Sequence, residues 1–180
     1  HLCDMNEAKF DVTDGTDDKQ IDAIHMDDEN STFYVIQGKF INATTVDAEP
    51  LREVLASWAQ LNDLVRLQEN CNPKLQRKLS EVAKALDDDY KVVFELLTTA
   101  KLTASAQNDL AAFQEQMGNS DDFVASIHLV DAEELKRRYD MALDRENPSI
   151  SHSVQLEAGK FVQISIANTK AVLAAIPLKD

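Results

Sequence analysis

Residues 20–40, with the sequence QIDAIHMDDENSTFYVIQGKF, decide the fold. The segments 21–27 and 33–41 are rich in β-branched and aromatic residues, which predicts two strands. Turn-forming residues at 27–31 separate them, which predicts a hairpin. Side chains alternate along a strand, so Gln37 and Lys39 project from one face. The hairpin is expected to bring Asp22 close to both across the ladder.

The polar residues of this hairpin predict a site for a divalent cation and a phosphate. Hard divalent cations prefer oxygen ligands, which Asp22, the Gln37 amide and the Gly38 carbonyl would supply. Lys39 would either help to orient or deprotonate an attacking water, or stabilise developing negative charge. A structural alternative also exists, in which Asp22 begins one strand and Lys39 extends its ammonium to solvent at the end of the other.

The remainder of the chain alternates between helical and strand patterns. Asp47 and Pro50 predict a helix start, followed by an apolar stripe at helical spacing that is expected to pack on the sheet. Asn72-Pro73 predicts the start of the next helix, which ends at residues 87–89. A strand at 90–99, a helix at 104–117, a strand at 123–130 and a helix at 132–143 follow. The stripe consists of Leu51, Val54, Leu55, Trp58, Leu61 and Val65.

This order predicts an α/β fold, with a mixed sheet flanked by helices and a largely parallel later part. Residues 1–145 are expected to form one domain, with a boundary at Arg145-Glu-Asn-Pro148. Strands are expected at 160–167 and 172–177, as a short β-rich extension. We interpret residues 146–180 as the start of a truncated following region, and the absence of an initial Met as a sign that the chain is a fragment.

Asp22, Gln37 and Lys39 resemble the motif of the PD-(D/E)xK restriction-endonuclease-like superfamily, in its Q-x-K form as in Mrr-like nucleases. The segments 14–24 and 33–40 look more narrowly like the N-terminal domain of the abortive-infection phage-resistance (AIPR) family. The motif covers residues 14–40, and the element order covers about 7–145. The resemblance implies a restriction-endonuclease-like nuclease domain with Mg²⁺ or Mn²⁺ as cofactor. Its expected partner is nucleic acid, with DNA favoured over RNA, bound through the full-length protein.

The resemblance also implies roles for individual residues. Asp22 matches the metal-binding aspartate of the superfamily, Gln37 its Glu/Gln position and Lys39 its lysine. The superfamily often adds an acid from a preceding helix, for which Glu7 is the candidate here. The chain departs from the Mrr-like pattern at Lys19-Gln20, where those proteins usually carry Gly-Gly before Ile-Asp.

The composition of the chain limits the class of protein that it can be. Hydrophobic residues make up 44% of the chain and charged residues 28%, a balance typical of globular proteins. No apolar run approaches the roughly 20 residues that span a bilayer, and no signal-peptide pattern is present, so a cytoplasmic protein without membrane partners is expected. Cys3 and Cys71 have no metal-binding spacing, which favours two reduced thiols.

Charge favours a different conclusion from that of the motif. The chain has 18 Lys+Arg against 32 Asp+Glu, a net charge of −14. Phosphate neutralisation by basic residues supplies most non-specific nucleic-acid binding, so this chain is a poor stand-alone binder. The acids Asp11, Asp14, Asp17 and Asp18 could gather metal ions, although a solvated loop is the favoured interpretation. The run 87–89 is interpreted as a helix-to-strand turn.

Three functions therefore remain open. The leading hypothesis is a metal-dependent nuclease domain of a bacterial phage-defence protein. The second is a catalytically inactive nuclease-fold module for binding or sensing, favoured by the acidic balance and the missing Gly-Gly. The third is a protein-interaction domain that uses the helix containing Trp58. His25 and His128 are expected to be structural, and a homo-oligomer stays open.

Overall fold

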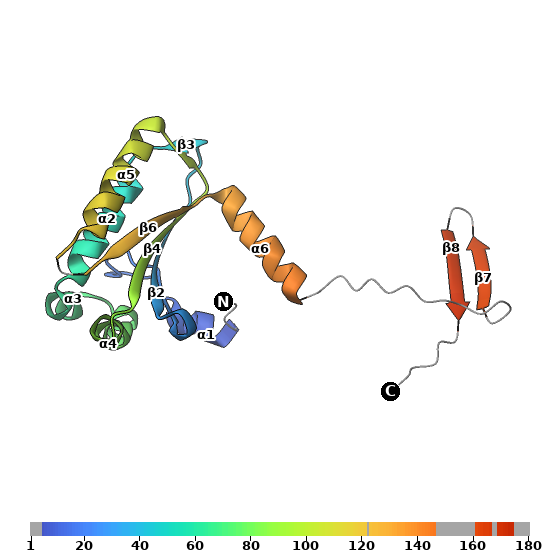
Figure 1. Cartoon of the computed structure of the whole chain (residues 1–180), viewed down its shortest axis with the longest axis horizontal. Helices are drawn as coiled ribbons and strands as arrows, with labels where there is room; N and C mark the ends of the chain where they lie inside the picture. The colour runs from blue at the N-terminus through green and yellow to red at the C-terminus, as the bar shows by residue number, and fades with distance from the viewer. Residues whose placement is uncertain (1–4, 122, 147–160, 167–168, 175–180) are drawn as a thin grey trace. The chain divides into compact units, whose positions relative to one another are not determined.

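The computed structural model describes residues 5–121, 123–146, 161–166 and 169–174, with side chains for 8–121 and 123–145 (Figure 1). The chain divides into two compact units, 1–143 and 144–180. Unit 1 contains a four-stranded sheet in the order β1-β2-β4-β6. The strands are β1 (Ala23–Asp27), β2 (Thr32–Lys39), β4 (Lys91–Thr98) and β6 (Ala125–Val130).

The hairpin expected from the sequence is present, and the later strands are parallel. β1 pairs antiparallel with β2, with Ala23 opposite Ile36 and Asp27 opposite Thr32. β2 pairs parallel with β4, and β4 parallel with β6. The connection is a 3-10 turn, η1 (Asp28–Asn30), where the Asp27 carboxylate accepts from the Asn30 N–H and Ser31 adopts φ 46°. The mixed α/β sheet flanked by helices is therefore confirmed.

Four helices complete the layer on one face of the sheet. They are α2 (Glu49–Leu61), α3 (Leu64–Asn70), α4 (Pro73–Asp87) and α5 (Ala104–Gly118), and Figure 1 shows α2 and α5 side by side. Because side chains alternate between the two faces of a strand, one set points into this layer: Phe33 and Val35 of β2, and Val92, Phe94 and Leu96 of β4. These side chains are at most 3% exposed and form the core with the apolar residues of α2 and α4.

The apolar stripe of residues 51–65 belongs to two helices rather than one. α2 ends at Leu61, and Asp63 caps α3 by accepting from the Arg66 N–H (3.1 Å). Val65, expected in the stripe, is 72% exposed because the chain turns before it. Asp47 does not cap α2; its carboxylate accepts from the Thr103 hydroxyl (2.9 Å). The other stripe residues contribute to the core, and Trp58 packs edge-on against Phe123 with ring centroids 6.4 Å apart.

The opposite face of the sheet receives α1 (Met5–Asp11) and α6 (Ala132–Glu146). Periodicity did not predict α1, although the resemblance made Glu7, which lies in it, the candidate acid of a preceding helix. Asp11 at its end contacts His25 of β1, at 2.7 Å between Oδ2 and Nδ1. α6 is held to the sheet by Arg138, whose Nη1 lies 2.9 Å from a Glu95 carboxylate oxygen. Asn72 caps α4 as expected, accepting from the N–H groups of Lys74 and Leu75.

Two further pairs of short strands complete the structure. β3 (Thr45–Val46) and β5 (Lys101–Leu102) form a two-residue parallel pair that was not expected. In the second unit, β7 (Phe161–Ile166) pairs antiparallel with β8 (Thr169–Ala174). β8 begins three positions before the expected 172, and residues 175–177 lie outside the described part. Of the helices described, none has the length and apolarity needed to cross a bilayer.

Candidate functional site

Asp22 lies where the loop 12–22 enters β1, at the end of the sheet where β2 ends. Its N–H donates to the Ile36 carbonyl (2.9 Å), and Ile36 also pairs with Ala23. Asp22 therefore lies just before the β1–β2 ladder, whose first pair is Ala23 with Ile36. The Asp22 carboxylate accepts from the Gly38 N–H (2.6 Å). The position of Asp22 relative to β2 therefore differs from the regular ladder that the sequence suggested.

The loop before Asp22 has an unusual backbone. Asp17, Lys19 and Gln20 all have positive φ, between 58° and 66°, and Gly15 has φ 150°. Left-handed conformations of residues other than glycine are costly and persist only where the surroundings enforce them. The Asp18 carboxylate contributes, accepting from the N–H groups of Gly15 (3.1 Å) and Gln20 (2.8 Å). The loop is therefore held in one specific shape.

Helices α2 and α4 hold this loop from outside. Asn72, at the start of α4, donates its N–H to the Asp17 carbonyl (3.0 Å) and its side-chain amide to the Thr13 carbonyl (2.9 Å). Ser57 of α2 donates to the Lys19 carbonyl (3.1 Å). Ser57 is 1% exposed, so its hydroxyl is shielded from water and forms its hydrogen bond within the protein. The loop is thus tied to two core helices at several points.

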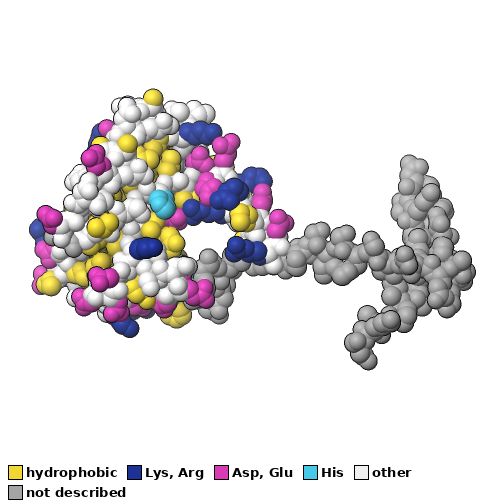
Figure 2. All heavy atoms as spheres, in the orientation of Figure 1, with side chains coloured by type: hydrophobic (Ala, Val, Ile, Leu, Met, Phe, Trp, Pro, Cys, Tyr) yellow, Lys and Arg dark blue, Asp and Glu magenta, His cyan; other side chains and the backbone are white. Residues whose placement is uncertain are grey.

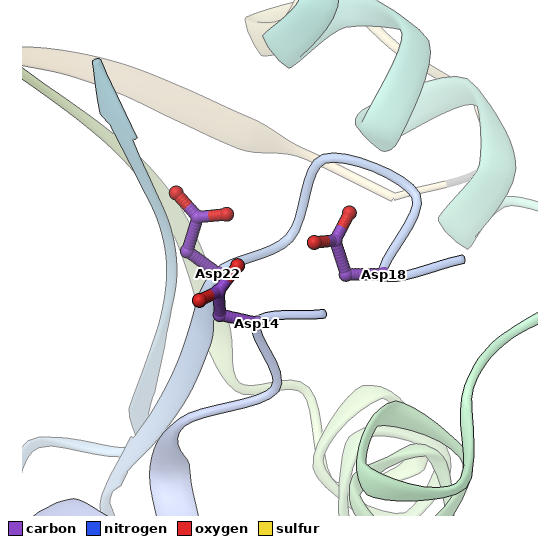
Figure 3. Close-up of side chains that lie close together, drawn as sticks. All are labelled: Asp14, Asp18 and Asp22. Atoms are coloured by element: carbon purple, nitrogen blue, oxygen red, sulfur yellow. The ribbon is translucent and has the colours of Figure 1, made fainter. Parts of the chain in front are cut away.

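Three carboxylates meet at this loop. One oxygen each from Asp14, Asp18 and Asp22 lie within 4.8 Å of one another. Figure 3 shows Asp14 and Asp18 on the loop and Asp22 where the loop joins the sheet. Burial raises the pKa of Asp22, the Asp18 and Asp14 charges raise it further, and the Gly38 bond and the Lys39 charge lower it. Like charges at this separation repel, so the cluster favours a bound cation or proton.

Gln37 and Lys39 project from one face of β2, as alternation requires, and meet a residue that sequence reasoning missed. Glu53 of α2 accepts from the Gln37 side-chain amide (2.7 Å), and the same oxygen lies 2.5 Å from the Lys39 ammonium. Gln37 is only 3% exposed, and its Oε1 has no partner among the described residues. Glu53 therefore fixes the Gln37 side chain through the amide nitrogen, and the amide oxygen of Gln37 stays available as an acceptor.

A signal for Glu53 was present in the sequence. Glu53 and Ser57 are four residues apart and border the apolar stripe of α2, so they share one edge of that helix. In the structure this edge faces the site: Ser57 bonds the loop, and Glu53 bonds β2. A polar edge beside a core stripe could have been recognised. Its partners could not, because they depend on how α2 crosses the sheet.

The remaining residues of interest are distributed differently. Asp11 is bound to His25 and to Lys78 of α4, at 2.8 Å from the ammonium, and Asp17 pairs with Lys19 at 3.0 Å. Neither aspartate belongs to the carboxylate cluster. Glu7 lies in α1, and its side chain is outside the described residues. The Gly38 contact that the structure gives is through the N–H, not the carbonyl expected as a ligand.

Of the histidines that the structure describes, neither His25 nor His128 belongs to the cluster of Asp14, Asp18 and Asp22. The His25 ring stacks on Tyr34, with centroids 6.3 Å apart, on the face of the sheet opposite Gln37. His128 is exposed in β6 and borders an open groove of about 1220 Å³. The groove lies at the starts of β4 and β6, with Tyr90 and Phe123 among its lining residues. Asp22, Gln37 and Lys39 are not part of it.

Comparison of the chain with protein-family models, with curated proteins and with solved structures found no match.

Proposed function

We propose that unit 1 is a metal-dependent nuclease domain of the restriction-endonuclease-like kind, which hydrolyses phosphodiester bonds of nucleic acid in a bacterial phage-defence protein. One observation carries the proposal. Asp22 and Lys39 lie at the same end of the β1–β2 hairpin, the Lys39 charge lowers the pKa of Asp22, and Asp14 and Asp18 lie beside Asp22. The Q-x-K motif on β2 and the mixed α/β sheet support the same class.

The residues present fit a hard divalent cation such as Mg²⁺ or Mn²⁺. Their donors are oxygens: the carboxylates of Asp14, Asp18 and Asp22, and the unpartnered buried Oε1 of Gln37. Hard cations prefer such oxygens to nitrogen or sulfur. The carboxylates would hold the ion, with Gln37 as a further ligand. When bound, the ion would polarise the scissile phosphate and lower the pKa of a bound water.

The protein's own residues would position and stabilise the reacting groups. Lys39 would place its ammonium where negative charge develops on the phosphate, a contribution that depends on fixed geometry. Glu53 supplies that geometry by holding Lys39 and Gln37 with one oxygen. An ammonium already paired with a carboxylate is better suited to stabilising charge than to accepting a proton. We therefore favour charge stabilisation as the role of Lys39.

A binding or sensing module without turnover is the second candidate function. Two features favour it. The amide of Gln37 stands at the position where the superfamily also uses a glutamate. The Lys39 charge is neutralised by the Glu53 carboxylate. In that case the site would bind a cation and nucleic acid without cleaving. The net charge of −14 is also easier to reconcile with a module that relies on the full-length protein for affinity.

A cleavage assay with paired variants tests the nuclease proposal. The chain would be incubated with Mg²⁺ or Mn²⁺ on plasmid, linear duplex and RNA. Asp22→Asn and Lys39→Ala should each lower the rate by about 100-fold or more, as the loss of one charge-stabilising group does. Asp17→Asn and Lys101→Ala are matched controls, because both residues form exposed ion pairs outside the cluster.

Two results would count against this assignment. Cleavage by Asp22→Asn and Lys39→Ala at the wild-type rate would reject these residues as the site. Absence of cleavage by the wild type, together with Mn²⁺ binding that is lost in Asp22→Asn, would favour the sensing module over the nuclease.

A further inference from the structure

Glu53 of α2 and Asp22 reach β2 at three consecutive residues. The Asp22 carboxylate accepts from the Gly38 N–H (2.6 Å), and the Glu53 carboxylate contacts the side chains of the residues on either side. One turn after Glu53, Ser57 donates to the carbonyl of Lys19 (3.1 Å), in the loop that ends at Asp22. This edge of α2 therefore lies beside both parts of the proposed cation site, the loop and the strand.

The Glu53 carboxylate uses one of its two oxygens in these contacts. Oε2 accepts from the Gln37 amide (2.7 Å) and lies 2.5 Å from the Lys39 ammonium. In the part of the chain that the structure describes, no group bonds the other oxygen, Oε1. The side chain is 25% exposed, so a cation can reach it from solvent. Oε1 is therefore available as a ligand while Oε2 keeps both of its contacts.

Gln37 provides a second oxygen at the same junction of α2 and β2. Its side chain is 3% exposed, and its Oε1 has no hydrogen-bond partner among the described residues. Burying an amide oxygen without a bond is costly, and a bound ion is one group that offsets this cost. Glu53 holds the amide through its nitrogen, which shares a carbon with that oxygen. The two contacting side chains thus each keep one oxygen for a ligand.

Oxygen ligands that include carboxylates suit a hard divalent cation. A charge of +2 attracts a carboxylate twice as strongly as an ammonium at the same distance, so Lys39 does not prevent Glu53 from binding such an ion. We propose that Glu53 is a ligand of the cation through Oε1 and holds Lys39 beside that cation through Oε2. A carboxylate that bridges the two would keep both positive charges in position to contact one phosphate. This inference rests on the proposed function.

Mn²⁺ binding to the whole chain tests the role of Glu53 without cleavage, with the electron paramagnetic resonance signal of the free ion as readout. Glu53→Gln keeps an acceptor for Gln37 but removes the charge, and it should lower the affinity by about tenfold or more, as changes at metal sites do. This variant also leaves the Lys39 charge unpaired, so the comparison is repeated in Lys39→Met. Adding Glu53→Gln to Lys39→Met should weaken binding by a similar factor.

A matched control is needed because the chain carries many other carboxylates. Acidic side chains are scattered over the face in Figure 2, and the net charge is −14, so weak Mn²⁺ binding elsewhere on the surface is expected. Glu49→Gln removes an exposed carboxylate one turn earlier on α2. Its Mn²⁺ affinity should match that of the wild type.

The outcomes separate this proposal from the proposed function. A Glu53→Gln defect that disappears in the Lys39→Met background rejects the ligand, because Glu53 would then only neutralise the lysine. Unchanged binding by Glu53→Gln, with binding lost in Asp22→Asn, also rejects the ligand and leaves the proposed function standing. Glu53-dependent binding by a protein that cleaves nothing supports the ligand and rejects the nuclease. A wild type that binds no Mn²⁺ overturns both.

Discussion

Removing the Glu53 carboxylate tests the internal support of the site. In Glu53→Ala, the buried Gln37 amide would lose its acceptor, and leaving such a donor unsatisfied costs about 1–3 kcal/mol. The Lys39–Glu53 ion pair, with side chains 33% and 25% exposed, adds about 0–1 kcal/mol after solvent screening. We therefore expect Glu53→Ala to lower the free energy of unfolding by about 1–4 kcal/mol. Glu53→Gln keeps an acceptor for Gln37 and should cost less than about 1 kcal/mol.

Urea unfolding measures this difference directly. Trp58 is the one tryptophan of the chain and is buried in unit 1, so its fluorescence reports the unfolding of that unit. The Glu53→Ala midpoint should fall by about 1 M with an unchanged slope. Glu49→Ala, an exposed acid on the same helix, is the control and should change stability by less than about 0.5 kcal/mol. Equal midpoints for Glu53→Ala and Glu53→Gln would refute the reasoning, because they would mean that Gln37 does not depend on this acceptor.

Three further predictions follow from the burial and charge of individual residues. Trp58→Ala should cost about 3–5 kcal/mol in chemical unfolding followed by circular dichroism. Trp58→Phe should fold and elute as the wild type in size exclusion; a changed elution volume would favour an interaction role for α2. The raised pKa of Asp22 means that its ionisation costs stability above that pKa, so Asp22→Asn should be more stable than the wild type at neutral pH without metal. That advantage should shrink as pH falls through the raised pKa toward 3.8, and an advantage that grows on acidification would contradict it. Lys78→Met leaves buried Asp11 without its ammonium partner and should cost about 3 kcal/mol, against little for exposed Arg77→Met, as measured by urea midpoints.

Local patterns were sufficient for most of the scaffold. The hairpin of residues 23–39, the Asn72 cap and the helix ending at Gly118 follow from turn formers, capping residues and periodicity. The apolar stripe at 51–65 was interpreted as part of one helix, because its helical periodicity continues across Asn62-Asp63. In the structure Asp63 caps a new helix there. Local patterns predicted neither α1 nor the β3–β5 pair, because short elements owe their stability to the surrounding fold more than to their own sequence.

The site was predictable in its chemistry but not in its arrangement. The residue types of Asp22, Gln37 and Lys39 indicated a metal and phosphate site. The Asp22 carboxylate accepts from the Gly38 N–H, and no local pattern predicts that contact. Lys78 of α4 is 8% exposed, and its ammonium lies 2.8 Å from the Asp11 carboxylate at the end of α1. Glu53 and Lys78 both depend on contacts between distant elements, which a single sequence does not display.

Mn²⁺ bound to the crystallised protein tests the central claim most directly. Anomalous diffraction locates manganese without ambiguity, and the ion should lie at about 2.0–2.3 Å from an Asp22 carboxylate oxygen. Asp14 or Asp18 should be a second ligand, and the ion should be absent from crystals of Asp22→Asn. Manganese that binds only elsewhere, or equal occupancy in wild type and Asp22→Asn, would contradict the account of this site.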